Sequence, residues 1–160
     1  MGYIEERKNL GEISQILEKM GVPHKFEDIG GDRNEVFPAI ICIYRCNNLD
    51  FDVIIYNIGQ WIHVKCLIMN LEQIRSEILL SIYEIALELN YDLPEVTFSS
   101  HKNQLYIEVD CFVFTSLEDF KGEFLSIGDG IEAFITIMDK QREIALKSTV
   151  GQIRTESTSS

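Results

Sequence analysis

The chain has 160 residues, of which 46% are hydrophobic and 25% are charged, and its formal net charge is −12. This size and composition predict one globular domain with enough apolar material for a core. An acidic surface repels phosphate groups, which argues against binding to nucleic acid or to an anionic membrane. The apolar runs are shorter than the ~20 residues of a membrane-spanning helix, and we expect a cytoplasmic protein.

The N-terminal part of the chain predicts a helix followed by antiparallel strands. The helix covers residues 4–20 and ends at Gly21, a residue suited to a left-handed C-cap. A short edge strand is expected over residues 22–28, followed by a turn at 30–34 that lacks the Gly-x4-Gly-Lys pattern of a phosphate loop. Three strands come next, joined by short Asn- and Gly-containing connectors that favour a meander. They occupy about residues 36–46, 51–56 and 61–69.

A long amphipathic helix is predicted to begin at Asn70, which can act as an N-cap with Gln73 reaching back to it. Its main apolar stripe recurs at helical spacing and is expected to face the core. That stripe consists of Leu71, Ile74, Ile78, Ile82, Ile85 and Leu89. A second apolar set, Leu80, Tyr83 and Leu87, lies well round the helix. Either another part of the chain covers this set, or it contacts a second subunit or a ligand.

After Pro94 the sequence changes from helical to strand period and predicts a hairpin. Alternation along the second strand places one set of residues on the buried face. That set is Leu105, Ile107, Val109, Cys111 and Val113. The other face begins polar and ends in Phe112 and Phe114, which we expect to be covered.

A terminal helix is predicted after Ser116, which can cap it. Its apolar residues keep one register for about six turns, and we expect a kink or brief interruption at Gly128-Asp129-Gly130. The polar chain from 148 to 160 is predicted to be a disordered tail. Residues 1–147 would then form a single α+β chaperone-like domain.

No catalytic or metal-binding pattern is recognisable in the sequence. The four cysteines, expected to be buried free thiols, lack the close pairing of a zinc site. His101 lies beside two serines in the hairpin turn, but no carboxylate orients it and no Gly-x-Ser-x-Gly motif is present. His63, alone in a strand, is expected to be structural. We therefore expect no catalytic residue, no bound metal and no cofactor.

The predicted order is a helix, a three-strand antiparallel meander, a long helix, a two-strand hairpin and a terminal helix. This order resembles the type III secretion chaperone-like fold. Leu89-Asn90-Tyr91, Val96-Thr97-Phe98, Leu105 to Val109 and the helix from Leu117 to Ile135 resemble the YbjN-type family. The resemblance implies a small acidic protein that often dimerises and binds extended or partly unfolded polypeptide. It carries over no active site, because YbjN-like members are described as regulators without a known reaction.

We therefore predict a non-enzymatic module that binds a protein or peptide, as a chaperone-like or regulatory adaptor. The partner would be a client polypeptide or, in a homodimer, a second copy. The candidate binding residues are Trp61, Leu80, Tyr83, Leu87, Tyr106, Phe112 and Phe114. A small-molecule sensor domain is the alternative, and an enzyme without a recognisable motif is a weaker one.

Overall fold

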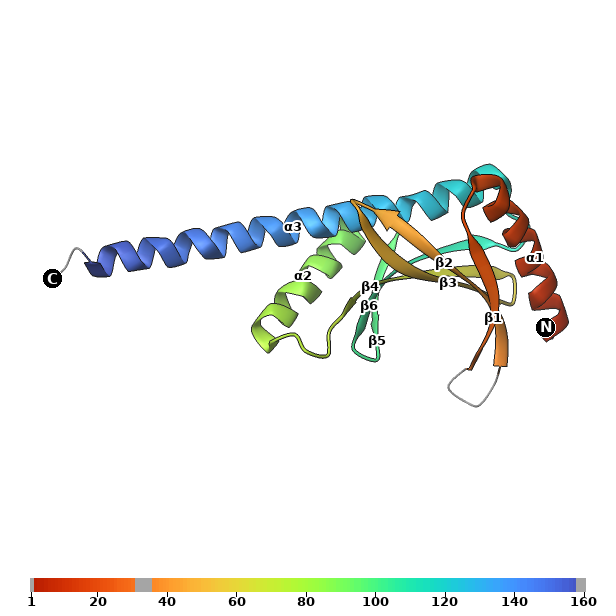
Figure 1. Ribbon diagram of the computed structural model, residues 1–160, viewed down its shortest axis with the longest axis horizontal. Coiled ribbons are helices and arrows are strands. Elements are labelled where there is room, and N and C mark those ends of the chain that lie inside the picture. Colours follow the sequence, from red (N-terminus) through yellow and green to blue (C-terminus); the bar gives the residue numbers. More distant parts are fainter. Residues whose placement is uncertain (1, 31–35, 158–160) are drawn as a thin grey trace.

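The computed structural model describes residues 2–30 and 36–157, with side chains as far as residue 143 (Figure 1). The elements are α1 (Tyr3–Met20), β1 (His24–Gly30), β2 (Val36–Cys46), β3 (Leu49–Ile58), β4 (Trp61–Asn70), α2 (Ser76–Asp92), β5 (Thr97–His101), β6 (Gln104–Phe112) and α3 (Leu117–Ser157). This order confirms the predicted α+β class and layout. Most of the turn predicted at 30–34 lies outside the described residues.

The strands form one antiparallel sheet in the order β1-β2-β3-β4-β6-β5. The β2-β3-β4 meander is as predicted, and its first connector is a tight turn because Asn47 and Asn48 adopt φ values of 52° and 62°. Lys102 and Asn103 make the equivalent turn between β5 and β6, with φ values of 49° and 59°. The sheet therefore has two edge strands, β1 and β5.

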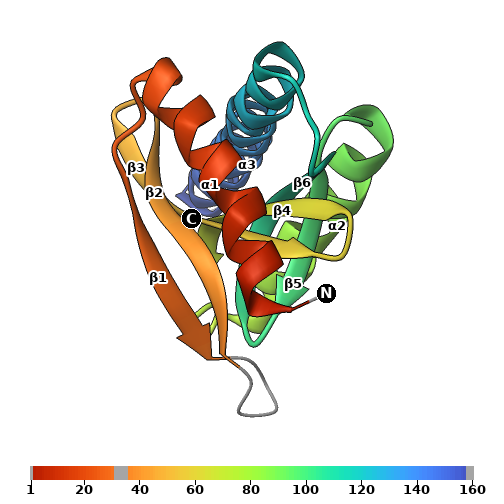
Figure 2. The same ribbon diagram turned by 90° about the vertical axis from the view of Figure 1, so that its right-hand side faces the viewer.

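All three helices contribute to a single core against one face of the sheet. Figure 2 shows α1 at the front of the molecule, where it packs on β2 and β3, and α3 contacts β6 and α2. The predicted buried alternation in β6 is confirmed, and so is the apolar stripe of α3. The opposite face of the sheet, called the outer face below, carries residues such as Trp61, His63 and Lys65.

Two predicted helix caps are confirmed. Gly21 ends α1 in the left-handed conformation, with φ 72°, and its N–H donates to the Glu18 carbonyl. The Ser116 hydroxyl oxygen accepts the Asp119 N–H at 3.0 Å, which fixes the start of α3.

The predicted start of the central helix at Asn70 is wrong, because α2 begins at Ser76. The Asn70 side-chain oxygen instead accepts the Glu72 N–H at 2.9 Å, which closes a local turn. The Leu71 N–H donates to the Asn103 carbonyl at 2.7 Å, so this segment is tied to the β5–β6 turn. Leu71 is buried as predicted, but from a loop rather than from a helix.

The interruption predicted at Gly128-Asp129-Gly130 is also wrong, because α3 is helical throughout. A Cβ atom on Gly128 would lie 2.7 Å from the Tyr44 hydroxyl oxygen, and one on Gly130 would lie 3.0 Å from Ile107 Cδ1. These glycines therefore allow the helix to approach its neighbours closely instead of breaking it.

The C-terminal part of α3 also differs from the prediction. The helix runs to Ser157, past residue 148, where a disordered tail was expected. Ala145, Leu146 and Lys147 favour a helix and no proline follows, so local propensity permits the continuation. This part projects beyond the sheet (Figure 1). Among the described residues, no helix combines the length and apolar composition needed to cross a membrane.

Candidate functional site

The seven candidate binding residues do not form one site. Trp61 on β4 and Tyr106 and Phe112 on β6 belong to the outer face of the sheet. Leu80, Tyr83 and Leu87 belong to α2, which packs against β5 and α3. Phe114 follows β6 in the turn that leads to α3. The structure thus divides the predicted residues between two surfaces.

An aromatic shelf lies at one end of the outer face and consists of Ile58, Trp61 and Phe112. These residues occupy facing positions on β3, β4 and β6, and the Trp61 and Phe112 rings have centroids 4.5 Å apart. Trp61 is 46% exposed and Phe112 is 47% exposed. The prediction that Phe112 and Phe114 are covered is wrong, because the chain turns after β6 and carries α3 to the opposite face. That turn is closed by the Thr115 N–H, which donates to the Phe112 carbonyl at 3.0 Å.

Paired polar side chains occupy the middle of the outer face. His63 Nδ1 lies 2.6 Å from an Asp110 oxygen, and Lys65 Nζ lies 2.8 Å from a Glu108 oxygen. Burial lowers the pKa of Lys65, but the hydrogen bond and charge of Glu108 outweigh it and the net shift is upward. Lys65 also lies over the Tyr106 ring, 4.7 Å from its centroid. Tyr106 therefore belongs to this polar region and is separate from the aromatic shelf.

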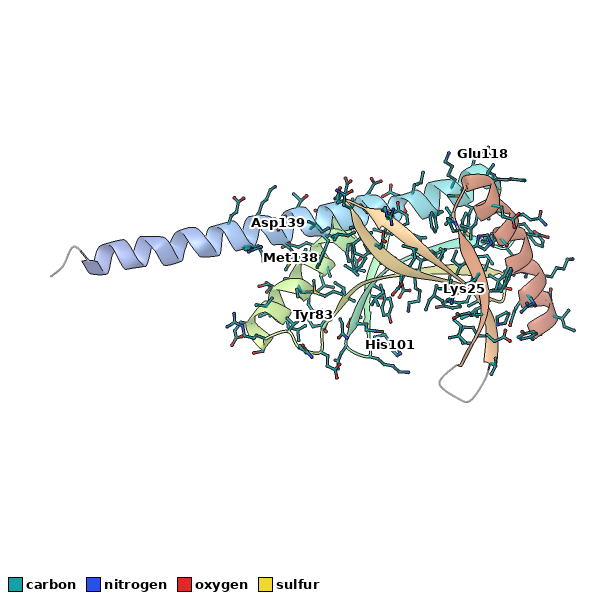
Figure 3. The ribbon with its side chains drawn as sticks, in the orientation of Figure 1. Lys25, Tyr83, His101, Glu118, Met138 and Asp139 are labelled. Atoms are coloured by element: carbon teal, nitrogen blue, oxygen red, sulfur yellow. The ribbon has the colours of Figure 1, made fainter. Side chains whose placement is uncertain are left out.

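The second apolar set on the central helix is exposed. Leu80 is 61% exposed and Leu87 is 69% exposed, so internal covering, one of the two interpretations of this set, does not hold for these residues. Tyr83, labelled in Figure 3, is half-buried. Its hydroxyl lies 3.4 Å from Ser100 Oγ. Tyr91, which the sequence analysis did not single out, is 90% exposed and continues the set by one turn. Leu80, Tyr83, Leu87 and Tyr91 are called the α2 stripe below.

Asn90 closes the edge of the sheet beside the α2 stripe. Its side-chain oxygen accepts the Phe98 N–H at 2.5 Å, and its Nδ2 donates to the Phe98 carbonyl at 3.0 Å. Among the described residues β5 pairs only with β6, so these are the groups that a further strand would use. A cavity of about 230 Å³ remains between α2 and β5, lined by Tyr83, Ala86, Leu87, Asn90, Phe98, Ser99, Ser100 and Leu105. A partner at this position would bind by packing side chains rather than by adding a strand.

A larger cavity of about 500 Å³ lies between the start of α2 and α3. It is lined by Arg75, Glu77, Ile78, Ser81, Met138, Gln141 and Arg142. Met138 marks its α3 side in Figure 3. Neither guanidinium group has an ion pair or hydrogen bond among the described residues. The cavity therefore combines an apolar wall with two guanidinium groups and the carboxyl group of Glu77.

The thiols are free, as predicted, and burial makes three of them poor nucleophiles. Burial raises the pKa values of Cys42, Cys66 and Cys111 to about 12, so these thiols are protonated at neutral pH. Within the described ranges, no group of three or more His, Cys, Asp or Glu side chains is placed to hold a metal ion.

One serine–histidine pair was missed by the sequence analysis. Ser14 Oγ lies 2.6 Å from His24 Nε2, while His24 Nδ1 lies 2.9 Å from the Val22 carbonyl. The carbonyl can only accept, so Nδ1 carries a proton, and in the neutral imidazole Nε2 accepts from the serine hydroxyl. The pair joins α1 to β1, and neither residue lines the cavities described above. Only contact across the α1–β1 turn reveals it, because the residues share no recognised motif.

No protein-family model matches the chain, and no curated protein is found as a relative.

Proposed function

We propose that this protein is a non-enzymatic module that binds another protein, as a chaperone-like or regulatory adaptor in the cytoplasm. The observation that carries the proposal is the exposure of the α2 stripe on a helix whose other face lies in the core. The resemblance of the element order to the type III secretion chaperone-like fold and the YbjN-type family supports the same function. A client protein is the proposed partner.

The α2 stripe has the dimensions of a helix-binding surface. Leu80, Tyr83, Leu87 and Tyr91 follow one another at steps of three or four residues. They span roughly 16 Å along the helix axis, about three turns. Burying a leucine side chain stabilises a contact by about 1.5–3 kcal/mol. Replacing both Leu80 and Leu87 with glutamate should therefore weaken the contact by at least about a hundredfold.

Photo-crosslinking tests this proposal. A benzoylphenylalanine in place of Tyr91 should crosslink to a protein partner in cells, and the Leu80→Glu/Leu87→Glu variant should abolish the product. The control position is Leu125, which is half-exposed on α3. Light scattering would identify a second copy as the partner if the wild type is dimeric and the folded double variant is monomeric. A monomeric wild type with no crosslink above the Leu125 control would refute the proposal.

A small-molecule sensor is the second candidate function, and the cavity between α2 and α3 favours it. Arg75 and Arg142 suit an anionic group, and Ile78 and Met138 suit an apolar one. The fitting ligand is an organic anion with an apolar portion. Native mass spectrometry should show such a compound copurifying with the wild type and lost from Arg75→Ala/Arg142→Ala. Equal occupancy of the two proteins would contradict the assignment.

A further inference from the structure

We propose that the open edge of β6 beside the aromatic shelf binds an extended, cationic segment of a protein partner in which apolar and basic residues alternate. This surface is separate from the α2 stripe. The inference therefore goes beyond the function proposed above and can fail without affecting it.

The edge is open because β5 is shorter than β6. β5 pairs with β6 only from Gln104 to Glu108, and among the described residues the segment from Val109 to Phe112 pairs only with β4. The chain before β5 leaves the sheet, since the Val96 N–H donates to the Leu93 carbonyl at 3.3 Å. Backbone groups of alternate residues point to the same side of a strand, so Asp110 presents its N–H and carbonyl to the open side. A partner strand can pair there.

Negative charge gathers around this edge. The carboxyl group of Glu123 interacts electrostatically with those of Glu95, Asp110 and Asp119. Asp110 is paired with His63, and within the described part of the chain no lysine or arginine forms an ion pair with any of these four carboxyl groups. Burial raises the pKa of Glu123, and the charges of the other three raise it further. A nearby cavity of about 390 Å³ is lined by Leu93, Glu95, Val96, Gly122, Ser126 and Asp129. It can admit a lysine or arginine side chain between the carboxylates of Glu95 and Asp129.

At this edge, the two faces of the sheet favour different residues in the partner strand. An added strand would point alternate side chains to the outer face, where Phe112 and Trp61 offer apolar surface. The intervening side chains would point to the α3 side, where Glu123 lies. Basic residues are favoured there by opposite charge, and a second copy of this chain, with its net charge of −12, lacks that complementarity.

Trp61 is the single tryptophan, so its fluorescence reports on this site directly. The probe is an acetylated and amidated peptide with four Lys-Val repeats, and the control peptide has Glu-Val repeats. We expect a saturable change in Trp61 emission with the first peptide only. Glu95→Gln/Glu123→Gln should weaken binding at least about fivefold, and Phe112→Ser should weaken it similarly. Glu84→Gln/Glu88→Gln, which removes the same charge from the exposed face of α2, should change it less than about twofold.

Two N-methylated forms of the Lys-Val peptide test strand pairing. One is methylated at the lysine nitrogens and the other at the valine nitrogens. Only one set of N–H groups can face β6, so one form should bind and the other should not. Equal binding of both forms, equal loss in the two charge variants, or no binding of the unmodified peptide to folded wild type would each overturn the proposal. The Leu80→Glu/Leu87→Glu variant should bind the peptide normally.

Discussion

Replacing Gly128 with alanine should destabilise the protein, although alanine is the better helix former. The new Cβ would lie 2.7 Å from the Tyr44 hydroxyl oxygen. Tyr44 cannot move away freely, because its ring is buried against Phe124, with centroids 5.2 Å apart. Its hydroxyl also donates to the Leu125 carbonyl at 3.2 Å. The substitution therefore forces a buried aromatic ring to shift.

The balance of effects can be worked out from these contacts. Alanine gains about 1 kcal/mol over glycine in a helix. Overpacking costs about 1–3 kcal/mol, and loss of the Tyr44 hydrogen bond costs about 1 kcal/mol. The net loss should be about 1–3 kcal/mol. Gly122 is the matched control in the same helix, since no atom lies within 4 Å of a Cβ there, and Gly122→Ala should stabilise by about 0.5–1 kcal/mol.

Urea unfolding followed by circular dichroism would rank the variants. The expected order of stability is Gly122→Ala, wild type, Gly128→Ala, with unchanged m-values. Gly130→Ala should lie between the two variants because its closest neighbour is 3.0 Å away, at the end of the Ile107 side chain. Tyr44→Phe should reduce the penalty of Gly128→Ala, since it removes the clashing oxygen. If Gly128→Ala is as stable as Gly122→Ala, α3 does not approach β2 as closely as described.

Asn90→Ala should lower the free energy of unfolding by about 1–3 kcal/mol, since it leaves both backbone groups of Phe98 without a partner. Urea unfolding measures this loss, and a value below about 0.5 kcal/mol would contradict the role of Asn90 in closing the edge of β5. Cys46, the least buried thiol, should react first with a disulfide reagent at mildly alkaline pH, and prior labelling of any other cysteine would refute this order. The stability should also fall in alkali, because thiol pKa values are higher in the folded protein than in the unfolded chain. The thiol contribution is constant below about pH 9 and is lost as the pH rises toward about 12, which urea midpoints at several pH values would show. The groups concerned are Cys42, Cys66 and Cys111.

Local patterns predicted much of this fold because they depend on few residues. The turn at Asn47-Asn48 needs only residues that tolerate positive φ, and both have it. The alternation in β6 and the stripe in α3 are periodic, so their buried faces follow from spacing alone. Periodicity does not reveal whether the other face of the sheet is also covered. The exposure of Phe112 was therefore missed.

The remaining errors concern partners that are distant in sequence. Leu71 stays outside α2 because its N–H is bonded to Asn103, and Gly128 permits a contact with Tyr44. A glycine pair that breaks a helix and one that admits a neighbour look the same in a sequence. Asn90 was quoted only as part of a family resemblance, although its side chain occupies the edge of β5. Such roles become visible only once the sheet order is known.

The edge of β5, beside α2, and the open edge of β6, beside α3, differ in the backbone groups they leave free. The two proposed contacts should therefore differ in kind. At β5 the side chain of Asn90 already takes the backbone groups that a strand would need, so the neighbouring α2 stripe offers side chains alone. At β6 the shorter partner strand leaves backbone groups open beside Phe112. The side-chain pairs of His63 with Asp110 and of Lys65 with Glu108 separate the shelf from Tyr106 on the outer face. Binding at the α2 stripe should therefore depend on apolar area and little on salt, whereas binding at the β6 edge should weaken as salt screens its carboxylates.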